Sequence, residues 1–304
     1  MINLEINLGK KFTLKNPVMT ASGTCGYGDD LDAIIDINDY GGIVTKSLSR
    51  EPRAGNPPPR IVETPSGMIN SIGLANIGVE AFLKQKKPAL KKYRGQLIVN
   101  IAGKTKQEFL DVIKILEEES WIKGYEINVS CPNVKKGGIA FGTDPDVLFR
   151  LTREVREATN KFLIIKLSPN VTDIREVAIK VQEAGADAVS LVNTFYGAAI
   201  DIHTWKPKIN SVIGGLSGPA IKPAALAKVI KARKVLDIPI IGIGGISSGQ
   251  DVVEFMLAGA SAIELGTVHF FNPAAVIEIK KYLKEYCKQK EIDNLQDIVG
   301  KARI

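Results

Sequence analysis

The sequence has 304 residues, of which 45% are apolar and 24% charged, and its 40 basic against 33 acidic residues give a net charge of +7. A chain of this length and composition can bury a large core, which excludes the disordered and collagen-like classes. We find no run of ~20 apolar residues that would span a membrane, and no basic and apolar leader typical of a signal peptide. The mild charge excess permits an anionic ligand without indicating nucleic acid.

Short, nearly continuous apolar runs recur along the chain, with amphipathic stretches between them. Such runs are typical of parallel strands buried on both faces. The predicted strands are 17–21, 42–46, 96–101, 125–130, 162–168, 187–193, 239–244 and 262–266. The predicted helices are 106–118, 145–158, 173–184, 223–236 and 250–258. This alternation predicts an α/β fold with a single (β/α)8 barrel domain over residues 1–304, and an open doubly wound sheet is the alternative.

Two connections are too long for simple crossovers: residues 47–79 after the second predicted strand and 194–222 after the sixth. Both leave the carboxyl ends of their strands, where barrel enzymes carry their active sites. Long structured loops in this position usually cover or line a site. We therefore expect two substrate-covering insertions.

Polar residues lie at the ends of five consecutive predicted strands, namely Lys46, Asn100, Asn128, Lys166 and Asn193. One such residue is more often a satisfied core group, because an unpaired buried polar group is costly. Five on one rim favour a site for a polar ligand. Asparagine suits an amide-rich ring, whereas lysine suits a carboxylate, a phosphate or an anionic flavin.

Glycine-rich sequences mark the last two strands, at 241–246 and 264–267. Glycine allows the backbone to approach a ligand closely, and the loops after strands seven and eight are the usual phosphate site of such barrels. Either motif alone would be explained by a chain turn, but the two together favour phosphate binding. Residues 214–220 are a third candidate wall.

Three cysteines, Cys25, Cys131 and Cys287, are scattered along the chain without CxxC spacing. This suits a reducing compartment, so we expect a cytoplasmic protein with no zinc or iron–sulfur site of its own. Cys131 follows a strand end and precedes Lys135 and Lys136, whose charges could activate it as a base or nucleophile. Equally, Cys131 could be a small apolar residue at a strand end without a catalytic role. Cys25 and Cys287 are interpreted as incidental.

Two further features are interpreted without a functional role. His203 and His269 have no second ligand at metal spacing, so we expect no metal site. The run 84–94 has six basic residues, which fits a solvated helix end better than an anion-binding patch.

Beginning at Asn-Val-Ser-Cys-Pro-Asn (128–133), the sequence resembles the dihydroorotate dehydrogenases, FMN enzymes of pyrimidine biosynthesis. The resemblance covers essentially the whole chain in order. Its other motifs lie at 20–24, 45–48, 55–60, 70–76, 99–103, 165–170, 214–220, 242–246 and 265–267.

The resemblance implies oxidation of (S)-dihydroorotate to orotate, in which a base removes the C5 proton while a hydride passes from C6 to flavin N5. Cys131 occupies the position of the family's base, which is cysteine in soluble members and serine in membrane-associated ones. The positions that match orotate contacts are Lys46, Asn70, Ser71, Ile72, Gly73, Leu74, Asn128, Asn193 and Thr194, with Asn133 as a further candidate. The positions that match FMN contacts are Ser22, Lys46, Ser47, Asn100, Asn128, Lys166, Val192, Gly218, Gly244, Gly245, Gly266 and Thr267.

The segment 59–80 resembles the NAD-linked soluble group more than the homodimeric, fumarate-dependent group. This implies a catalytic subunit, with a homodimer core in a heterotetramer, that passes electrons to NAD through a partner carrying FAD and a 2Fe–2S cluster. The sequence itself has neither cluster ligands nor a dinucleotide fingerprint. A dihydropyrimidine dehydrogenase-like flavoenzyme is an alternative within the resemblance.

Two other classes compete with a flavin dehydrogenase. A phosphate-binding barrel lyase or synthase would use Lys46 or Lys166 as a Schiff base. A nucleic-acid binder would rest on the basic run 84–94.

Overall fold

The computed structural model describes residues 2–32, 34–130 and 142–303. Its centre is a closed barrel of eight parallel strands in the order β10-β15-β16-β3-β4-β7-β8-β9, which confirms the predicted architecture. Nearly all of their residues are buried, as continuous apolar strands require. The barrel strands are β3 (Val18–Thr20), β4 (Gly42–Val44), β7 (Gln96–Ile101), β8 (Gly124–Asn128), β9 (Phe162–Lys166), β10 (Ala188–Leu191), β15 (Ile240–Ile243) and β16 (Ala262–Leu265).

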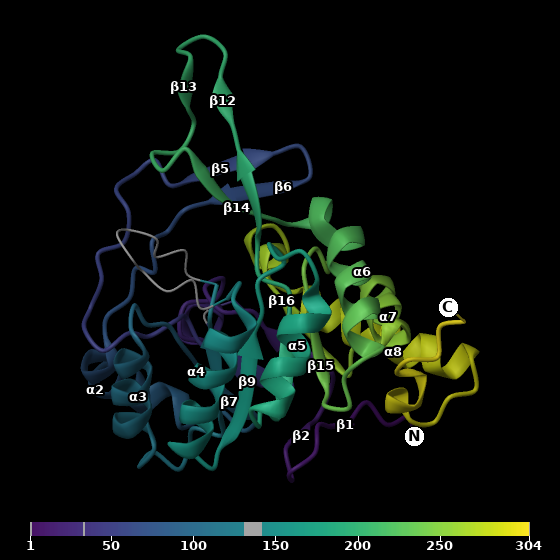
Figure 1. Cartoon of the computed structure of the whole chain (residues 1–304). Helices are drawn as coiled ribbons and strands as arrows, with labels where there is room; N and C mark the ends of the chain where they lie inside the picture. The colour runs from purple at the N-terminus through teal and green to yellow at the C-terminus, as the bar shows by residue number, and fades with distance from the viewer. Residues whose placement is uncertain (1, 33, 131–141, 304) are drawn as a thin grey trace.

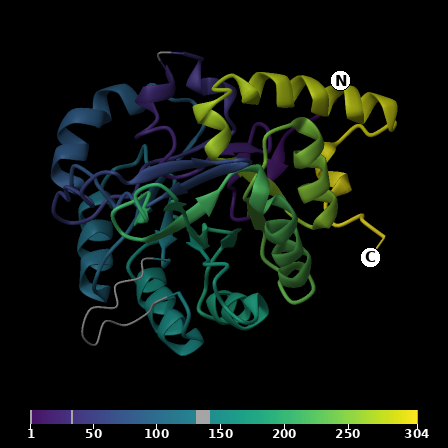
Figure 2. The same cartoon turned by 90° about the horizontal axis from the view of Figure 1, so that it is seen from above.

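Helices surround the strands, as the view from above shows (Figure 2). The α-helices of the described ranges are α1 (Asp29–Asp32), α2 (Val79–Leu90), α3 (Lys106–Leu116), α4 (Pro145–Glu157), α5 (Ile174–Glu183), α6 (Lys222–Arg233), α7 (Gly249–Ala258) and α8 (Ala275–Gln289). The 3-10 helices are η1 (Ile37–Asp39), η2 (Pro219–Ile221), η3 (Thr267–Phe270) and η4 (Leu295–Ile298). Within these ranges, no helix combines the length and apolar character that a membrane crossing demands.

The sequence determines where α7 starts and stops, and thereby where the last two barrel strands present their loops. Ser248 caps the helix in a capping box with Asp251. Gly259 ends the helix with a left-handed φ of 118°, a conformation that glycine adopts without the steric cost of a Cβ. The chain then enters β16.

The two long insertions form an antiparallel sheet that the sequence did not predict. The sheet has the order β11-β14-β6-β5 and lies at the end of the barrel opposite the hairpin of β1 and β2 (Figure 1). A short hairpin, β12 with β13, extends from it. The bounds are β1 (Ile6–Asn7), β2 (Thr13–Leu14), β5 (Ile61–Thr64), β6 (Gly67–Asn70), β11 (Phe195–Ala198), β12 (Ile200–Asp201), β13 (Lys206–Pro207) and β14 (Ile213–Ser217).

The basic run 84–94 belongs largely to the carboxyl-terminal half of α2, which confirms the helix-end interpretation. Two of its lysines are ion-paired: Lys86 with Asp29, and Lys87 with Glu119 at 2.5 Å. These pairs reduce the charge that the run could offer to an anionic partner.

His269 is buried beside the barrel, in the short helix η3. Its Nδ1 lies 3.0 Å from Thr24 Oγ1 and its Nε2 lies 3.0 Å from Tyr40 Oη. Burial lowers the pKa of His269 from 6.5 to about 4, so the imidazole is neutral in the folded protein at physiological pH.

We predict that His269 makes the fold sensitive to acid. The His269 imidazole binds a proton more readily in the unfolded chain than in the folded chain. The contribution of neutral His269 to the free energy of unfolding is therefore complete above pH 6.5 and is lost as the pH falls towards about 4. Urea unfolding of wild type and His269→Gln should show a stability difference that narrows by about 3 kcal/mol over this range. His203→Gln, at an exposed site, is the control. A difference that stays constant with pH would contradict the assignment.

Candidate active site

The closed parallel barrel brings the carboxyl ends of its strands together on one rim. The sequence-predicted residues of the described ranges lie at this rim or in the two insertions above it. Ser22, Lys46, Ser47, Asn100, Asn128, Lys166, Val192, Asn193, Thr194, Gly244, Gly245, Gly266 and Thr267 belong to the strand ends or the loops that follow them. Asn70 to Leu74 and Gly218 belong to the insertions. Cys131 and Asn133 lie outside the described residues.

A hydrogen-bonded belt connects several of these side chains across the barrel. Ser22 Oγ and Ser47 Oγ lie 3.4 Å apart, and Ser47 Oγ donates to Asn100 Oδ1 at 2.5 Å. Asn100 Nδ2 in turn donates to Glu126 Oε1 at 2.5 Å. The belt therefore continues from the half-buried Ser22 and the buried Ser47 at the rim to a fully buried carboxylate.

Lys166, the last residue of β9, is held between two buried carboxyl groups. Its Nζ lies 3.5 Å from Glu126 Oε1 and 3.3 Å from Glu264 Oε2. Burial alone would lower the pKa of Lys166, but the two carboxyl groups outweigh it and raise this pKa. Lys166 is therefore protonated at the rim, with its counter-charge beside it.

The sequence analysis missed both glutamates. Glu126 and Glu264 each interrupt a buried apolar strand, which is the same signal that singled out Lys166. In the sequence analysis, Glu264 was named only as the first residue of the sequence 264–267, which was singled out for its glycine. A search for any charged residue inside a continuous apolar strand would have found both.

Two asparagines orient one another beside this cluster. Asn193 Nδ2 donates to Asn128 Oδ1 at 3.3 Å, and Asn193 Oδ1 accepts from the Thr194 backbone N–H at 2.8 Å. Asn128 Oδ1 also accepts from the Ser130 backbone N–H at 3.2 Å. These contacts fix which edge of each amide faces the protein, and so preset the hydrogen-bonding pattern offered to a ligand.

Three backbone segments converge at another part of the rim. A Cβ on Gly245 would lie 2.9 Å from the Gly218 carbonyl oxygen, and one on Gly218 would lie 3.5 Å from Thr267 Cγ2. Thr267 Oγ1 donates to Ser217 Oγ at 2.9 Å. Glycine is required here because Gly218 and Gly245 have left-handed φ values of 96° and 73° in a crowded corner.

This corner fits the phosphate of the flavin that the resemblance implies. We find no hydrogen bond from the backbone N–H groups of Gly245, Gly266 or Thr267 to another residue of the described ranges. An added Cβ on Gly266 would meet only ordinary van der Waals contacts, the nearest being Ala21 Cβ at 3.6 Å. Unpaired backbone N–H groups at an uncrowded backbone are the donors that bind a phosphate.

The loop that follows β6 is fixed within its own insertion. Asn56 Nδ2 donates to the Ser71 carbonyl oxygen at 3.0 Å, and the Asn56 backbone N–H donates to the Ile72 carbonyl oxygen at 3.0 Å. Gly73 and Leu74 both have left-handed φ values, 72° and 58°. Within the described ranges we find no hydrogen bond or ion pair between this loop and Lys166, so the position of the loop in the site depends on the insertion as a whole.

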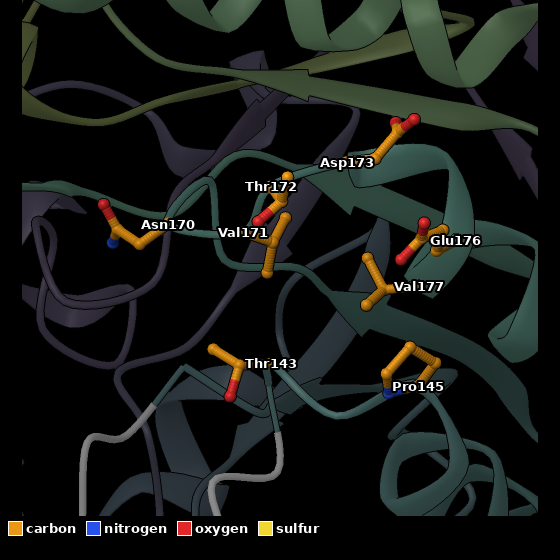
Figure 3. Close-up of a pocket in the computed structure, with 8 residues that line it drawn as sticks. All are labelled: Thr143, Pro145, Asn170, Val171, Thr172, Asp173, Glu176 and Val177. Atoms are coloured by element: carbon orange, nitrogen blue, oxygen red, sulfur yellow. The ribbon is translucent and has the colours of Figure 1, made fainter.

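A separate polar pocket of about 190 Å³ opens between the starts of α4 and α5 (Figure 3). Its lining includes the carboxyl groups of Asp173 and Glu176, which would repel an anionic ligand. Asn170 is shared with the rim, since its Nδ2 donates to the Thr194 carbonyl oxygen at 3.0 Å. We therefore place the candidate active site at the barrel rim and not in this pocket.

Comparisons with known proteins agree with this geometry. The family model "Dihydroorotate dehydrogenase" matches residues 4–287. A protein of Thermoanaerobacter sp. (strain X514), named dihydroorotate dehydrogenase B (NAD(+)), catalytic subunit, is 50% identical over 303 residues, which are 100% of both chains. A protein of the same name from Caldicellulosiruptor saccharolyticus is 48% identical over 304 residues, again 100% of both chains.

The fold is also found in a solved structure. The crystal structure of dihydroorotate dehydrogenase from Eimeria tenella in complex with ferulenol superposes with a TM-score of 0.83 and covers 98% of this chain and 88% of that one. Its sequence identity is 23%, so this likeness supports the architecture alone.

We predict that Gly245→Ala destabilises the fold more than its left-handed φ alone explains. The strain should cost about 1 kcal/mol, and crowding by Lys222 and Gly218 about 1–3 kcal/mol more. Gly9→Ala is the matched control, because Gly9 has a φ of 85° but no atom within 4 Å of an added Cβ. Equal losses of unfolding free energy in urea would refute the close packing of this corner.

Proposed function

The chain belongs to the dihydroorotate dehydrogenase family, and we propose that it is the FMN-binding catalytic subunit of the NAD-linked enzyme of that family. It oxidises (S)-dihydroorotate to orotate in pyrimidine biosynthesis. The observation that supports this subtype most directly is the identity of 48–50% over full length to relatives named as this catalytic subunit.

We propose that FMN is the hydride acceptor and that residues of the rim hold it. Gly218, Gly244, Gly245, Gly266 and Thr267 would bind its phosphate. Ser22, Lys46, Ser47, Asn100, Asn128, Lys166 and Val192 would contact the rest of the flavin. The charge on Lys166 would favour electron density on the reduced ring, because a fixed positive charge in a dry site stabilises an anion strongly.

The substrate is a six-membered ring with amide edges and one carboxylate, and it becomes planar on oxidation to orotate. Asn128 and Asn193 would pair with the amide edges, and their mutual hydrogen bond gives them a fixed orientation before substrate arrives. Lys46 would bind the carboxylate. Thr194, Asn70 and the loop 71–74 would complete the site from the two insertions and exclude water.

We propose Cys131 as the base that removes the C5 proton. It directly follows Ser130, whose backbone N–H is bound by Asn128, so the segment leading to it starts at the substrate-binding asparagine. A thiol is an effective base near neutral pH only when neighbouring groups favour its thiolate. Lys135 and Lys136 are close enough in sequence to supply such charges.

The relatives' name, catalytic subunit, implies a second subunit. We propose that this partner carries FAD and a 2Fe–2S cluster and passes the electrons to NAD. In this assembly, two copies of the chain form the core of a cytoplasmic heterotetramer. The described part of the chain has no group of three or more metal-binding side chains, and we place the cluster on the partner.

Anaerobic titration of the purified chain tests the activity. We expect FMN to bind and its yellow colour to be bleached by dihydroorotate. Dihydrouracil, which lacks the carboxylate, should bleach it far more slowly. A chain that stays colourless or inactive after FMN is added would refute the proposal, and faster reduction by dihydrouracil would favour a dihydropyrimidine dehydrogenase-like enzyme.

We predict that Cys131→Ser slows flavin reduction at neutral pH by at least about tenfold, because a serine hydroxyl is far less acidic than a thiol and is much more rarely in the deprotonated form that accepts a proton. Binding of FMN should not change. Stopped-flow absorbance measures the reduction rate, and Cys25→Ser serves as the control for cysteine loss elsewhere. Unchanged reduction kinetics would exclude Cys131 as the base.

The electron acceptor is tested separately. Turnover with NAD should require an added FAD and iron–sulfur partner, and fumarate should support little turnover. Efficient fumarate reduction by the chain alone would assign it to the homodimeric group instead.

A further inference from the structure

The function above uses Lys166 but assigns nothing to its buried partners, Glu126 and Glu264. The side chains of these residues are 6%, 0% and 0% exposed. Two ionised carboxylates beside one ammonium would leave a net negative charge inside the barrel, where charges are costly. One bound proton would make the cluster neutral.

The hydrogen bonds distinguish the two carboxyl groups. Glu126 accepts from Asn100 at 2.5 Å, from Ser190 at 2.8 Å and from Lys166 at 3.5 Å. Glu264 Oε2 accepts a hydrogen bond from Lys166 at 3.3 Å, and its buried Oε1 accepts none from a described residue. Donors stabilise a carboxylate, whereas a buried carboxylate oxygen without a donor is strongly destabilised.

We propose that Glu126 and Glu264 share one negative charge, carried by Glu126 while Glu264 keeps the proton, and that together they position Lys166 as a charged ammonium at the rim. Either carboxyl group can take the charge if the other loses it. Both are positioning residues, since they act through Lys166. The effect on a flavin rests on the proposed function, but the shared charge is a property of this chain alone.

The pKa shifts agree with this arrangement. Burial, reinforced by the charge of Glu126, raises the pKa of Glu264 well above its usual range. Burial also acts to raise the pKa of Glu126, but Lys166 and the other donors lower it overall. Cys25 interacts electrostatically with Glu264, and burial raises the pKa of its thiol to about 12, so it stays neutral.

The geometry places the counter-charge below the rim. Lys166 pairs in register with Asn128, and Glu126 lies two residues earlier on the same strand as Asn128. Because side chains two residues apart share a face of a strand, Glu126 occupies the next layer into the barrel. The positive charge of Lys166 is therefore balanced by a carboxylate within the barrel, and Lys166 stays protonated without a ligand.

Infrared spectroscopy at neutral pH tests the shared charge directly. The wild-type chain should show the carbonyl band of a protonated carboxylic acid. This band should disappear in Glu264→Gln, which removes the acid. It should also disappear in Glu126→Gln, because Glu264 then ionises to balance Lys166. The exposed control Glu157→Gln should keep it. A band that persists in Glu126→Gln, or is missing in wild type, would overturn the proposal.

A stability cycle provides a second measurement. Each single glutamine variant keeps one counter-charge and should unfold only slightly more easily. The double variant leaves Lys166 unpaired, so its unfolding constant should exceed the product of the single effects by about a hundredfold. Adding Lys166→Met should reverse most of this loss. Additive effects, or a loss that Lys166→Met does not reverse, would contradict the shared charge.

These outcomes separate the inference from the proposed function. Neither the infrared band nor the stability cycle requires flavin. A chain that shows both effects but binds no FMN would refute the function and keep the inference. A chain that is reduced by dihydroorotate but lacks both effects would do the opposite.

Discussion

Closure of eight parallel strands into one barrel is the constraint on which the rest of this structure depends. Closure sends the carboxyl ends of the strands to a single rim, so residues far apart in the chain become neighbours there. Ser47 and Asn100 are 53 positions apart and share a hydrogen bond. It also leaves a narrow interior in which an unpaired charge or polar group is costly.

The polar belt satisfies both requirements. Asn100, Glu126 and Ser190 lie on β7, β8 and β10, and the Glu126 carboxylate accepts a hydrogen bond from each of the other two. The buried ion pairs of Lys166 with Glu126 and Glu264 belong to the same interior. Such pairs seldom add stability compared with apolar packing. Their value lies in fixing a charged group where a water-excluded site can use it, which is how Lys166 would act on an anionic ring.

The barrel was predictable because each of its strands can be recognised from its own local sequence. Continuous apolar runs such as 162–168 can be buried only between two layers, and the structure places β9 within that run. The rim residues followed from the same pattern, since a lysine or asparagine at the end of such a run has to face the mouth. The locations of Lys166 and Asn193 were therefore within reach of sequence alone.

Other features were not predictable because they depend on distant pairings. β6 joins β14 with Asn70 opposite Gly215, and neither short strand carries an alternation strong enough to reveal the sheet. The two glutamates were visible as residues, but their shared contact with Lys166 requires the closed barrel. The role of Cys131 rests on the family resemblance and stays a prediction.

A crystal structure of the chain grown with FMN and orotate would test the central claim most directly. We predict that the flavin phosphate contacts Gly245 and Thr267, that its ring contacts Lys166, and that orotate contacts Asn128 and Asn193. A flavin bound elsewhere, such as in the pocket between α4 and α5, or an empty rim at saturating FMN, would contradict the account.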